Sequence, residues 1–172
     1  MAATGTVDYN TIALRNELFG PDIAGTAGYV KSINLEYLVR RTKSNPTLMM
    51  EMILLYVDQT PPIINAMKQS LLDEDWNLLQ SAVHKIIPSF SIMGISSDFE
   101  SMAKKIHEYA RQSALSAKEG KDKFIHASFP IKMSTGQLNR PELFEMILQL
   151  ENVCARACEE LKEEYTKIKN QN

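Results

Sequence analysis

Long apolar runs are absent from this sequence of 172 residues. A membrane-spanning helix needs about 18 or more consecutive apolar residues, and no segment approaches that length. The first ten residues, MAATGTVDYN, have neither the basic start nor the apolar stretch of a signal peptide. We therefore expect a cytoplasmic protein with no membrane insertion.

Positive charge is not in surplus either. The chain has 19 Lys and Arg residues against 21 Asp and Glu residues, which gives a formal net charge of -2. Binding to nucleic acid or to an anionic membrane usually needs a basic surplus. We expect no nucleic-acid partner, and a protein partner or a small ligand fits this charge balance better.

Cysteine is scarce, with Cys154 and Cys158 as the two examples. Their spacing of four residues inside a strongly helical segment is too close for a disulfide that closes a loop. His107 and His126 could add metal ligands, but the sequence has no paired CxxC or HxxxH grouping to support such a site. We predict two reduced packing residues and no metal site.

The hydrophobic content of 44% is enough for one sizeable core, and the length makes two domains improbable. No segment shows the alternating pattern of a strand. Apolar residues instead recur at helical spacing in four long segments joined mostly by short turns. The predicted fold is all-α: an antiparallel four-helix bundle with a short N-terminal helix and a partly irregular N-terminal extension.

The N-terminal part is rich in Gly, Ala and Thr, so residues 1–33 are predicted to be a partly disordered extension. Residues 34–170 would then form the helical bundle. Asn34 precedes a short amphipathic stretch. Further on, Asn45 followed by Pro46 is a specific signal for the start of a helix.

The helix that begins there is predicted to run to about Leu72, because its apolar residues share one face. Pro61 and Pro62 interrupt the pattern. Each proline removes an N–H donor and clashes with the preceding turn, so we expect a kink near Thr60 within one helix.

The next helix is predicted to run from about Trp76 to Ser91. The acidic turn at residues 73–75 supplies an aspartate to cap its first turn. Gly94 is placed to end the helix or to mark its close neighbour.

A further helix is predicted from Asp98 to about Ala117. Residues 118–136 then lose the helical period and form a long connection. The last helix starts near Arg140. It carries a near-heptad apolar stripe that packs lengthwise against other helices: Leu143, Ile147, Leu150, Cys154, Ala157 and Leu161.

The one credible chemical group is His84, on the helix from Trp76. The bulky apolar residues of that helix cluster in one arc at 100° per residue, and His84 lies roughly 110° from its centre. Its neighbours one or two turns away are small or polar, namely Gln80, Ser81, Pro88 and Ser91. We therefore predict an imidazole that a macromolecular partner can reach.

Neutral imidazole is a good nucleophile near neutral pH, because its ordinary pKa is about 6.5, and its nitrogen can accept a phosphoryl group. Surface histidines without a function are also common. The surrounding sequence has to decide between these two interpretations.

The stretch SAVHKIIPSFSIMGI resembles the signature of histidine-phosphotransfer (HPt) domains, relay modules that pass phosphate between receiver-domain aspartates. The family pattern reads roughly His-x-x-Lys-Gly-Ser-x-x-x-x-Gly. His84, Ser89 and Gly94 match it, in a variant with Pro88 at the small position. The order of a short helix, a proline-bearing helix and an acidic-Trp turn is also similar, and the resemblance covers about residues 34–109.

Two features depart from that family. The usual lysine three residues after the histidine is Ile87 here, so Lys85 is the nearest candidate to orient the phosphoryl oxygens. The connection at 118–136 is also longer than the family usually carries.

The resemblance implies a phosphorelay intermediate in two-component signal transduction. His84 would attack an aspartyl phosphate of a receiver domain and pass the phosphoryl group to another receiver. The chain itself would need no cofactor, because the partner receiver supplies the Mg²⁺. The expected partners are receiver domains of response regulators and hybrid sensor kinases, and the expected state is a monomer.

Around the phospho-acceptor His84, six residues are predicted to support the site: Lys85, Ser81, Pro88, Ser89, Ser91 and Gly94. For Ser89 and Gly94 we favour structural roles over direct chemistry, namely a hydrogen bond within the helix and a close approach of two backbone segments.

An alternative is a helical adaptor or inhibitor that binds a receiver or kinase without being phosphorylated. The isoleucine at 87 would be one symptom of such a degenerate relative. An enzyme with an independent active site is not indicated, because no nucleotide loop, catalytic triad or carboxylate pair occurs. A metal-binding bundle lacks the Glu-x-x-His pairs that such sites use.

Overall fold

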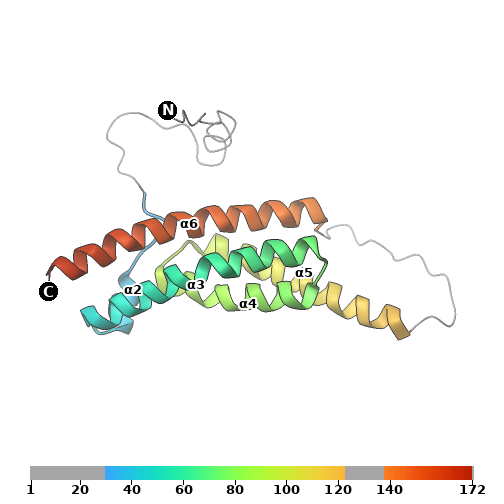
Figure 1. Cartoon of the computed structure of the whole chain (residues 1–172), viewed down its shortest axis with the longest axis horizontal. Helices are drawn as coiled ribbons and strands as arrows, with labels where there is room; N and C mark the ends of the chain where they lie inside the picture. The colour runs from blue at the N-terminus through green and yellow to red at the C-terminus, as the bar shows by residue number, and fades with distance from the viewer. Residues whose placement is uncertain (1–29, 123–137, 172) are drawn as a thin grey trace, which may run out of the picture. The chain divides into compact units, whose positions relative to one another are not determined.

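The computed structural model describes residues 30–122 and 138–171, and the chain divides into a unit Met1–Val30 and a unit Lys31–Asn172. All regular structure in the described ranges is helical, which confirms the all-α prediction. The helices (Figure 1) are α2 (Glu36–Arg41), α3 (Pro46–Leu72), α4 (Trp76–Met93), α5 (Ser97–Asp122) and α6 (Arg140–Gln171). None of these helices is both long enough and apolar enough to cross a membrane.

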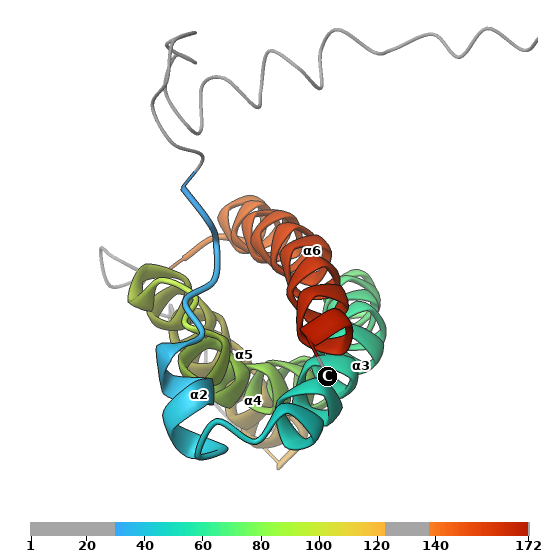
Figure 2. The same cartoon turned by 90° about the vertical axis from the view of Figure 1, so that its left-hand side faces the viewer.

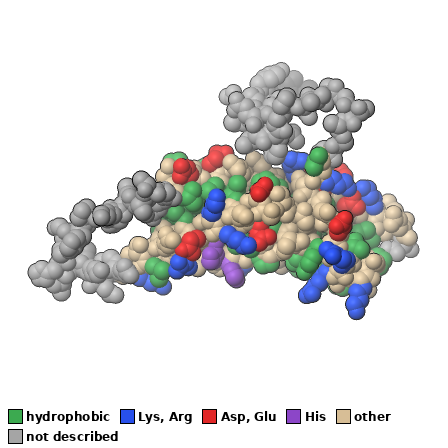
Figure 3. Space-filling model, turned by 180° about the vertical axis from the view of Figure 1, so that it is seen from behind, with side chains coloured by type: hydrophobic (Ala, Val, Ile, Leu, Met, Phe, Trp, Pro, Cys, Tyr) green, Lys and Arg blue, Asp and Glu red, His purple; other side chains and the backbone are tan. Residues whose placement is uncertain are grey.

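The four long helices pack against one another around a common core. α3 contacts α4 and α6, and α5 contacts α4 and α6, so each long helix has two neighbours (Figure 2). The short helix α2 packs on α4. Each long helix therefore buries one face and leaves another at the surface. On the side of the molecule shown in Figure 3, oppositely charged side chains are interspersed.

The core is built mainly from aliphatic side chains of every helix, together with two methionines, two cysteines, Phe90 and Tyr56. On α4, Val83, Ile86 and Phe90 are at most 1% exposed, as the predicted apolar arc requires. Trp76 and Ile87, from the same arc, are only partly buried. Burial of one such side chain is worth about 1.5–3 kcal/mol, so this face fixes the rotation of α4 about its axis.

The start of α3 follows the predicted cap. The Asn45 side chain accepts a hydrogen bond from the Leu48 backbone N–H at 3.1 Å, and Pro46 occupies the first turn. Pro61 and Pro62 are exposed and lie inside one helix, which confirms the prediction of a single helix, and the kink near Thr60 stays a prediction.

Both ends of α4 are set by local chemistry. The Asp75 carboxylate accepts from the Leu78 N–H at 2.9 Å. At the other end Gly94 adopts φ 65°, and the Ile95 N–H donates to the Phe90 carbonyl at 2.8 Å, the long bond of a Schellman motif. The last residue of α4 is therefore Met93, two residues beyond the expected Ser91, and Gly94 ends the helix as its cap, as predicted.

The end of α5 differs from the prediction. The helix continues to Asp122, so the expected connection at 118–136 is wrong at its beginning. The sequence there has lost its apolar period, but Ala117, Lys118 and Glu119 are strong helix formers that extend a helix already nucleated. The rest of that connection, residues 123–137, lies outside the described residues.

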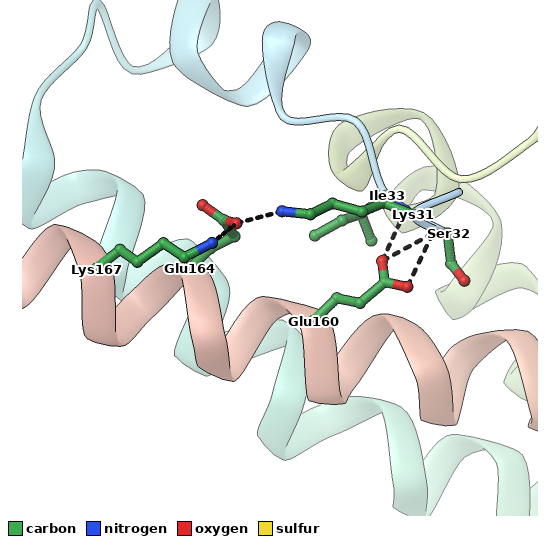
Figure 4. Close-up of polar contacts among 6 residues, drawn as sticks. All are labelled: Lys31, Ser32, Ile33, Glu160, Glu164 and Lys167. Carbon is green, nitrogen blue, oxygen red and sulfur yellow. Dashed lines mark hydrogen bonds and ion pairs between the residues drawn. The ribbon is translucent and has the colours of Figure 1, made fainter. Parts of the chain in front are cut away.

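The packed unit also begins earlier than expected. The Glu160 carboxylate on α6 accepts from the Ser32 N–H at 2.8 Å and from the Ile33 N–H at 3.2 Å (Figure 4). Ile33 is 6% exposed and belongs to the core. Lys31 pairs with Glu164 at 2.5 Å. Residues 31–33 are thus part of the helical unit, whereas most of the predicted extension lies outside the described residues.

Candidate functional site

His84 lies in the middle of α4 with an exposed side chain. The residues on either side of it in sequence show why. Val83 is buried in the core, and Lys85 is exposed, so the boundary between core and solvent passes through this turn. The predicted accessibility of the imidazole is confirmed.

The side chains that flank His84 along the same side of α4 are small. Ser81, Pro88 and Ser91 are all exposed, and the Ser91 hydroxyl donates to the Pro88 carbonyl at 3.1 Å. Residues three, four and seven positions apart share one side of a helix. Exposed small side chains therefore lie on both sides of the imidazole along the helix, whereas Gln80 and Ile87, also one turn away, are half-buried.

Pro88 has a second effect on this turn. In an α-helix the N–H of residue 88 would donate to the carbonyl of His84, four residues earlier, but proline has no N–H. The His84 carbonyl therefore cannot receive its usual helical hydrogen bond. The turn that carries the candidate nucleophile is one hydrogen bond short.

Ser89 and Gly94 have the structural roles that we favoured. The Ser89 hydroxyl, on a half-buried residue, donates to the Ile86 carbonyl at 2.6 Å. Gly94 lies against the backbone of Asn34, whose N–H donates to the Met93 carbonyl at 3.0 Å. Both residues shape the end of α4 and are not arranged to touch a group bound at the imidazole.

The position three residues after His84 offers no charge. Ile87 is half-buried and packs against the core. Lys85 is exposed, but one residue along a helix means a rotation of about 100° around its axis. A cation for a group on His84 has to come from a neighbouring helix or from a rearranged Lys85.

His107 on α5 is the residue beside His84 that sequence reasoning missed. The two ring centroids are 5.8 Å apart, with an angle of 41° between the ring planes. His107 is half-buried and His84 is exposed, so the pair lies at the edge of the α4–α5 contact. The two described histidines form a patch on the surface in Figure 3.

The sequence did contain a signal for this pair. His84 is nine residues before the last residue of α4, Met93, and His107 is ten residues after the first residue of α5, Ser97. When two consecutive helices fold back on each other, residues at equal distances from the connection lie at the same height. Counting outward from the two helix ends that flank the connection would have brought the two rings together.

Charged residues lie one turn to either side of His107 along α5. Lys104 pairs with Glu100 at 2.5 Å, and Arg111 pairs with Glu108 at 2.6 Å. The hydrogen bond from Arg111 lowers the pKa of the exposed Glu108 to about 2, and the charge of His107 acts in the same direction. Both cations are therefore already neutralised by acids on their own helix.

The cysteines and the pair of histidines are separate features. Cys154 and Cys158 are free and buried on α6. Burial raises the pKa of the Cys154 thiol to about 12, which disfavours the thiolate that binds metals. No group of three or more His, Cys, Asp and Glu side chains able to hold a metal occurs in the described ranges. His126 lies outside them.

The pocket found on the described surface includes neither histidine. This pocket of about 350 Å³ lies between the start of α4 and the far part of α5, and its lining includes Trp76, Asn77 and Ala114. His84 does not line it, because it stands two helical turns beyond Asn77.

An exposed imidazole with small neighbours and a second imidazole beside it can act as a nucleophile toward a large electrophilic partner. Of the predicted site residues, the structure brings Ser81, Pro88 and Ser91 alongside His84. Lys85 and Ser89 lie on other sides of α4, and Gly94 follows its last residue. No family model, curated protein or solved structure matches this chain.

Proposed function

We propose that this chain is a phosphorelay intermediate of the histidine-phosphotransfer type, which carries a phosphoryl group on His84. The observation that carries the proposal is the exposed imidazole at the centre of a long, well-packed helix, between small side chains. The resemblance of the sequence around His84 to the HPt signature suggests that the chemistry is phosphoryl transfer.

The proposed fold is an antiparallel four-helix bundle of α3, α4, α5 and α6, with α2 packed on α4. The cyclic order of helix contacts supports this arrangement. A bundle with a rigid outer face suits phosphotransfer, because the receiver has to place its phosphoryl group in line with the attacking nitrogen.

The transfer step needs one lone pair from this chain. The unprotonated ring nitrogen of His84 attacks phosphorus, a P–N bond forms, and the P–O bond to the receiver aspartate breaks. The electron pair of that bond stays on the aspartate carboxylate, and the other ring nitrogen of His84 keeps its proton. The receiver provides Mg²⁺, so this chain holds no cofactor.

The partners are receiver domains of response regulators and of hybrid sensor kinases. A receiver is compact enough to cover the α4–α5 surface. The exposed side chain of His84, which does not line the pocket, supports a macromolecular partner over a small ligand, because small ligands are usually enclosed by a cleft. We place this exchange in the cytoplasm and assign a monomer to the free protein.

One observation favours a second function, a non-phosphorylated adaptor that binds a receiver or kinase. Ile87 packs against the core at the position where the HPt pattern has lysine. An adaptor would keep the docking surface and lose the transfer.

The deciding experiment is transfer of ³²P from a phosphorylated receiver domain to this protein, to His84→Gln and to His126→Gln. The proposal predicts label on the wild type and on His126→Gln, loss of that label in acid, and no label on His84→Gln. A panel of receivers that bind the wild type but never label it would establish the adaptor instead.

The His84→Gln variant has to be folded for this comparison to count. Because His84 is exposed, its substitution is expected to change the free energy of unfolding by less than about 0.5 kcal/mol. Urea unfolding followed by circular dichroism checks this.

A further inference from the structure

The proposed phosphoryl group on His84 would carry negative charge that the adjacent turn of α4 does not balance. Ile87 contributes an apolar side chain that packs against the core. Lys85 points to a different side of α4. This inference rests on the proposed function and asks which residue binds the phosphoryl oxygens.

His107 is the residue with suitable geometry. Its ring lies on the neighbouring helix, with its centroid 5.8 Å from that of His84. This separation leaves a phosphoryl group on His84 close to the His107 ring, and a hydrogen bond between them needs a donor–acceptor distance of about 2.7–3.0 Å. Packing of α4 on α5 holds the two rings at this separation.

We propose that His107, as an imidazolium, donates a hydrogen bond to the phosphoryl group carried by His84 and replaces the lysine that the HPt pattern has at position 87. A charge-assisted hydrogen bond of this kind is stronger than a neutral one. It acts both on the charge that develops during transfer and on the phosphorylated product.

The other charges near His107 favour this assignment. On α5, Lys104 and Arg111 form ion pairs with Glu100 and Glu108, so their positive charge is already balanced. On α4, Lys85 is the exposed charge next to His84.

The proposal predicts a dependence on pH with a defined sign. An imidazole has an ordinary pKa of about 6.5, and a phosphoryl dianion beside it stabilises the charged form. The pKa of His107 is therefore higher in the phosphorylated protein than in the free protein. The assistance is complete below that pKa and is lost as pH rises through it.

The test uses phosphoramidate, which needs no partner protein. The imidazole nitrogen of His84 attacks phosphorus, the P–N bond of phosphoramidate breaks, and the leaving nitrogen departs as ammonia after taking a proton from solvent. The wild type is compared with His107→Gln, which is neutral, and His107→Lys, which stays charged to high pH. ³¹P NMR follows the rate of phosphohistidine formation from pH 6 to 8.5.

The expected result is that His107→Gln slows phosphorylation about tenfold at pH 6 and that this difference disappears toward pH 8.5. His107→Lys keeps the faster rate across the range. A second measurement on the wild type does not depend on any variant: NMR titration of the His107 ring should give a higher pKa after His84 is phosphorylated. A merely structural role for His107 would not raise that pKa.

The outcomes separate this inference from the proposed function. If His84 is phosphorylated while His107→Gln matches the wild type at every pH, and the His107 pKa does not move, His107 has no such role and the carrier function stands. If wild-type His84 accepts phosphate from neither phosphoramidate nor a receiver, both proposals fail. If His107→Gln does not fold, as judged by circular dichroism, the titration of the wild type decides.

Discussion

The backbone carbonyl of Asn34 occupies the space that a side chain on Gly94 would need. A Cβ built on Gly94 would overlap that oxygen and would lie 2.7 Å from the Asn34 nitrogen. Gly94 also has φ 65°, in the left-handed region. The glycine thus meets two separate requirements, a backbone angle and a close approach.

Replacing Gly94 is therefore expected to destabilise the fold, and two variants separate the causes. Gly94→Ala should lower the free energy of unfolding by more than about 2 kcal/mol, because it adds both strain and overlap. Asparagine tolerates a positive φ, so Gly94→Asn would be mild if the angle alone mattered. We expect it to be as harmful as alanine. Urea unfolding measures both, and a near-native Gly94→Asn would contradict the close approach.

The attachment of residues 31–33 depends on Glu160. This side chain is 4% exposed, and its carboxylate accepts hydrogen bonds from the N–H groups of Ser32 and Ile33. Glu160→Gln places an amide donor against these donors and should cost about 1–3 kcal/mol. Hydrogen exchange should speed up at both amides. Glu159→Gln, on an exposed neighbour, is the matched control, and equal exchange in the two variants would argue against the attachment.

Stability should fall at alkaline pH because of a buried thiol. Burial raises the pKa of Cys154 to about 12, whereas an unfolded thiol titrates near 8.5. The folded state keeps a proton that the unfolded chain loses, so this contribution is complete below about pH 8.5 and disappears as pH rises toward 12.

Urea unfolding of the wild type and of Cys154→Ala at pH 7 and pH 10 tests that contribution. The stability advantage of the wild type over the variant should shrink by about 1–2 kcal/mol at the higher pH. An advantage that stays constant would mean that the thiol ionises as easily in the folded protein as in the unfolded one.

The two prolines of α3 should weaken that helix. Alanine at positions 61 and 62 would restore N–H donors to the carbonyls of Val57 and Asp58, four residues earlier. Pro61 and Pro62 are both exposed, so little packing is lost. We expect the double alanine variant to have a free energy of unfolding at least about 2 kcal/mol higher than that of the wild type. Thermal and urea denaturation measure this difference. The exposed Asn65→Ala on the same helix serves as the control, and a double variant no more stable than this control would refute the expectation.

Helix boundaries were predictable wherever they depend on residues close in sequence. Asn45 and Asp75 each cap an N–H three residues later, and Gly94 ends α4 through its own backbone angle. A cap is a local competition for hydrogen bonds, so the sequence around it is sufficient. The exposure of His84 followed from helical geometry for the same reason.

Features that join distant segments were not predictable in this way. Ser32 and Glu160 are separated by 128 residues, and no periodicity connects them. The pairing of His84 with His107 was partly predictable. The two residues lie at nearly equal distances along the chain from the short connection between α4 and α5. By residue type alone His107 is a possible metal ligand for the cysteines, whereas its position along the hairpin puts it beside His84.

The hydrogen bonds of Ser32 and Asn34 also determine which helices would resist a force applied to the N-terminal end of the packed unit. Force along the chain from Val30 reaches α6 first, through Glu160, and then the end of α4, through the bond from Asn34 to the Met93 carbonyl. Neither bond involves α5. A pull on the N-terminal residues therefore acts on one helix of the two that carry the histidines, and any slip of α4 along α5 would change the separation of the two rings.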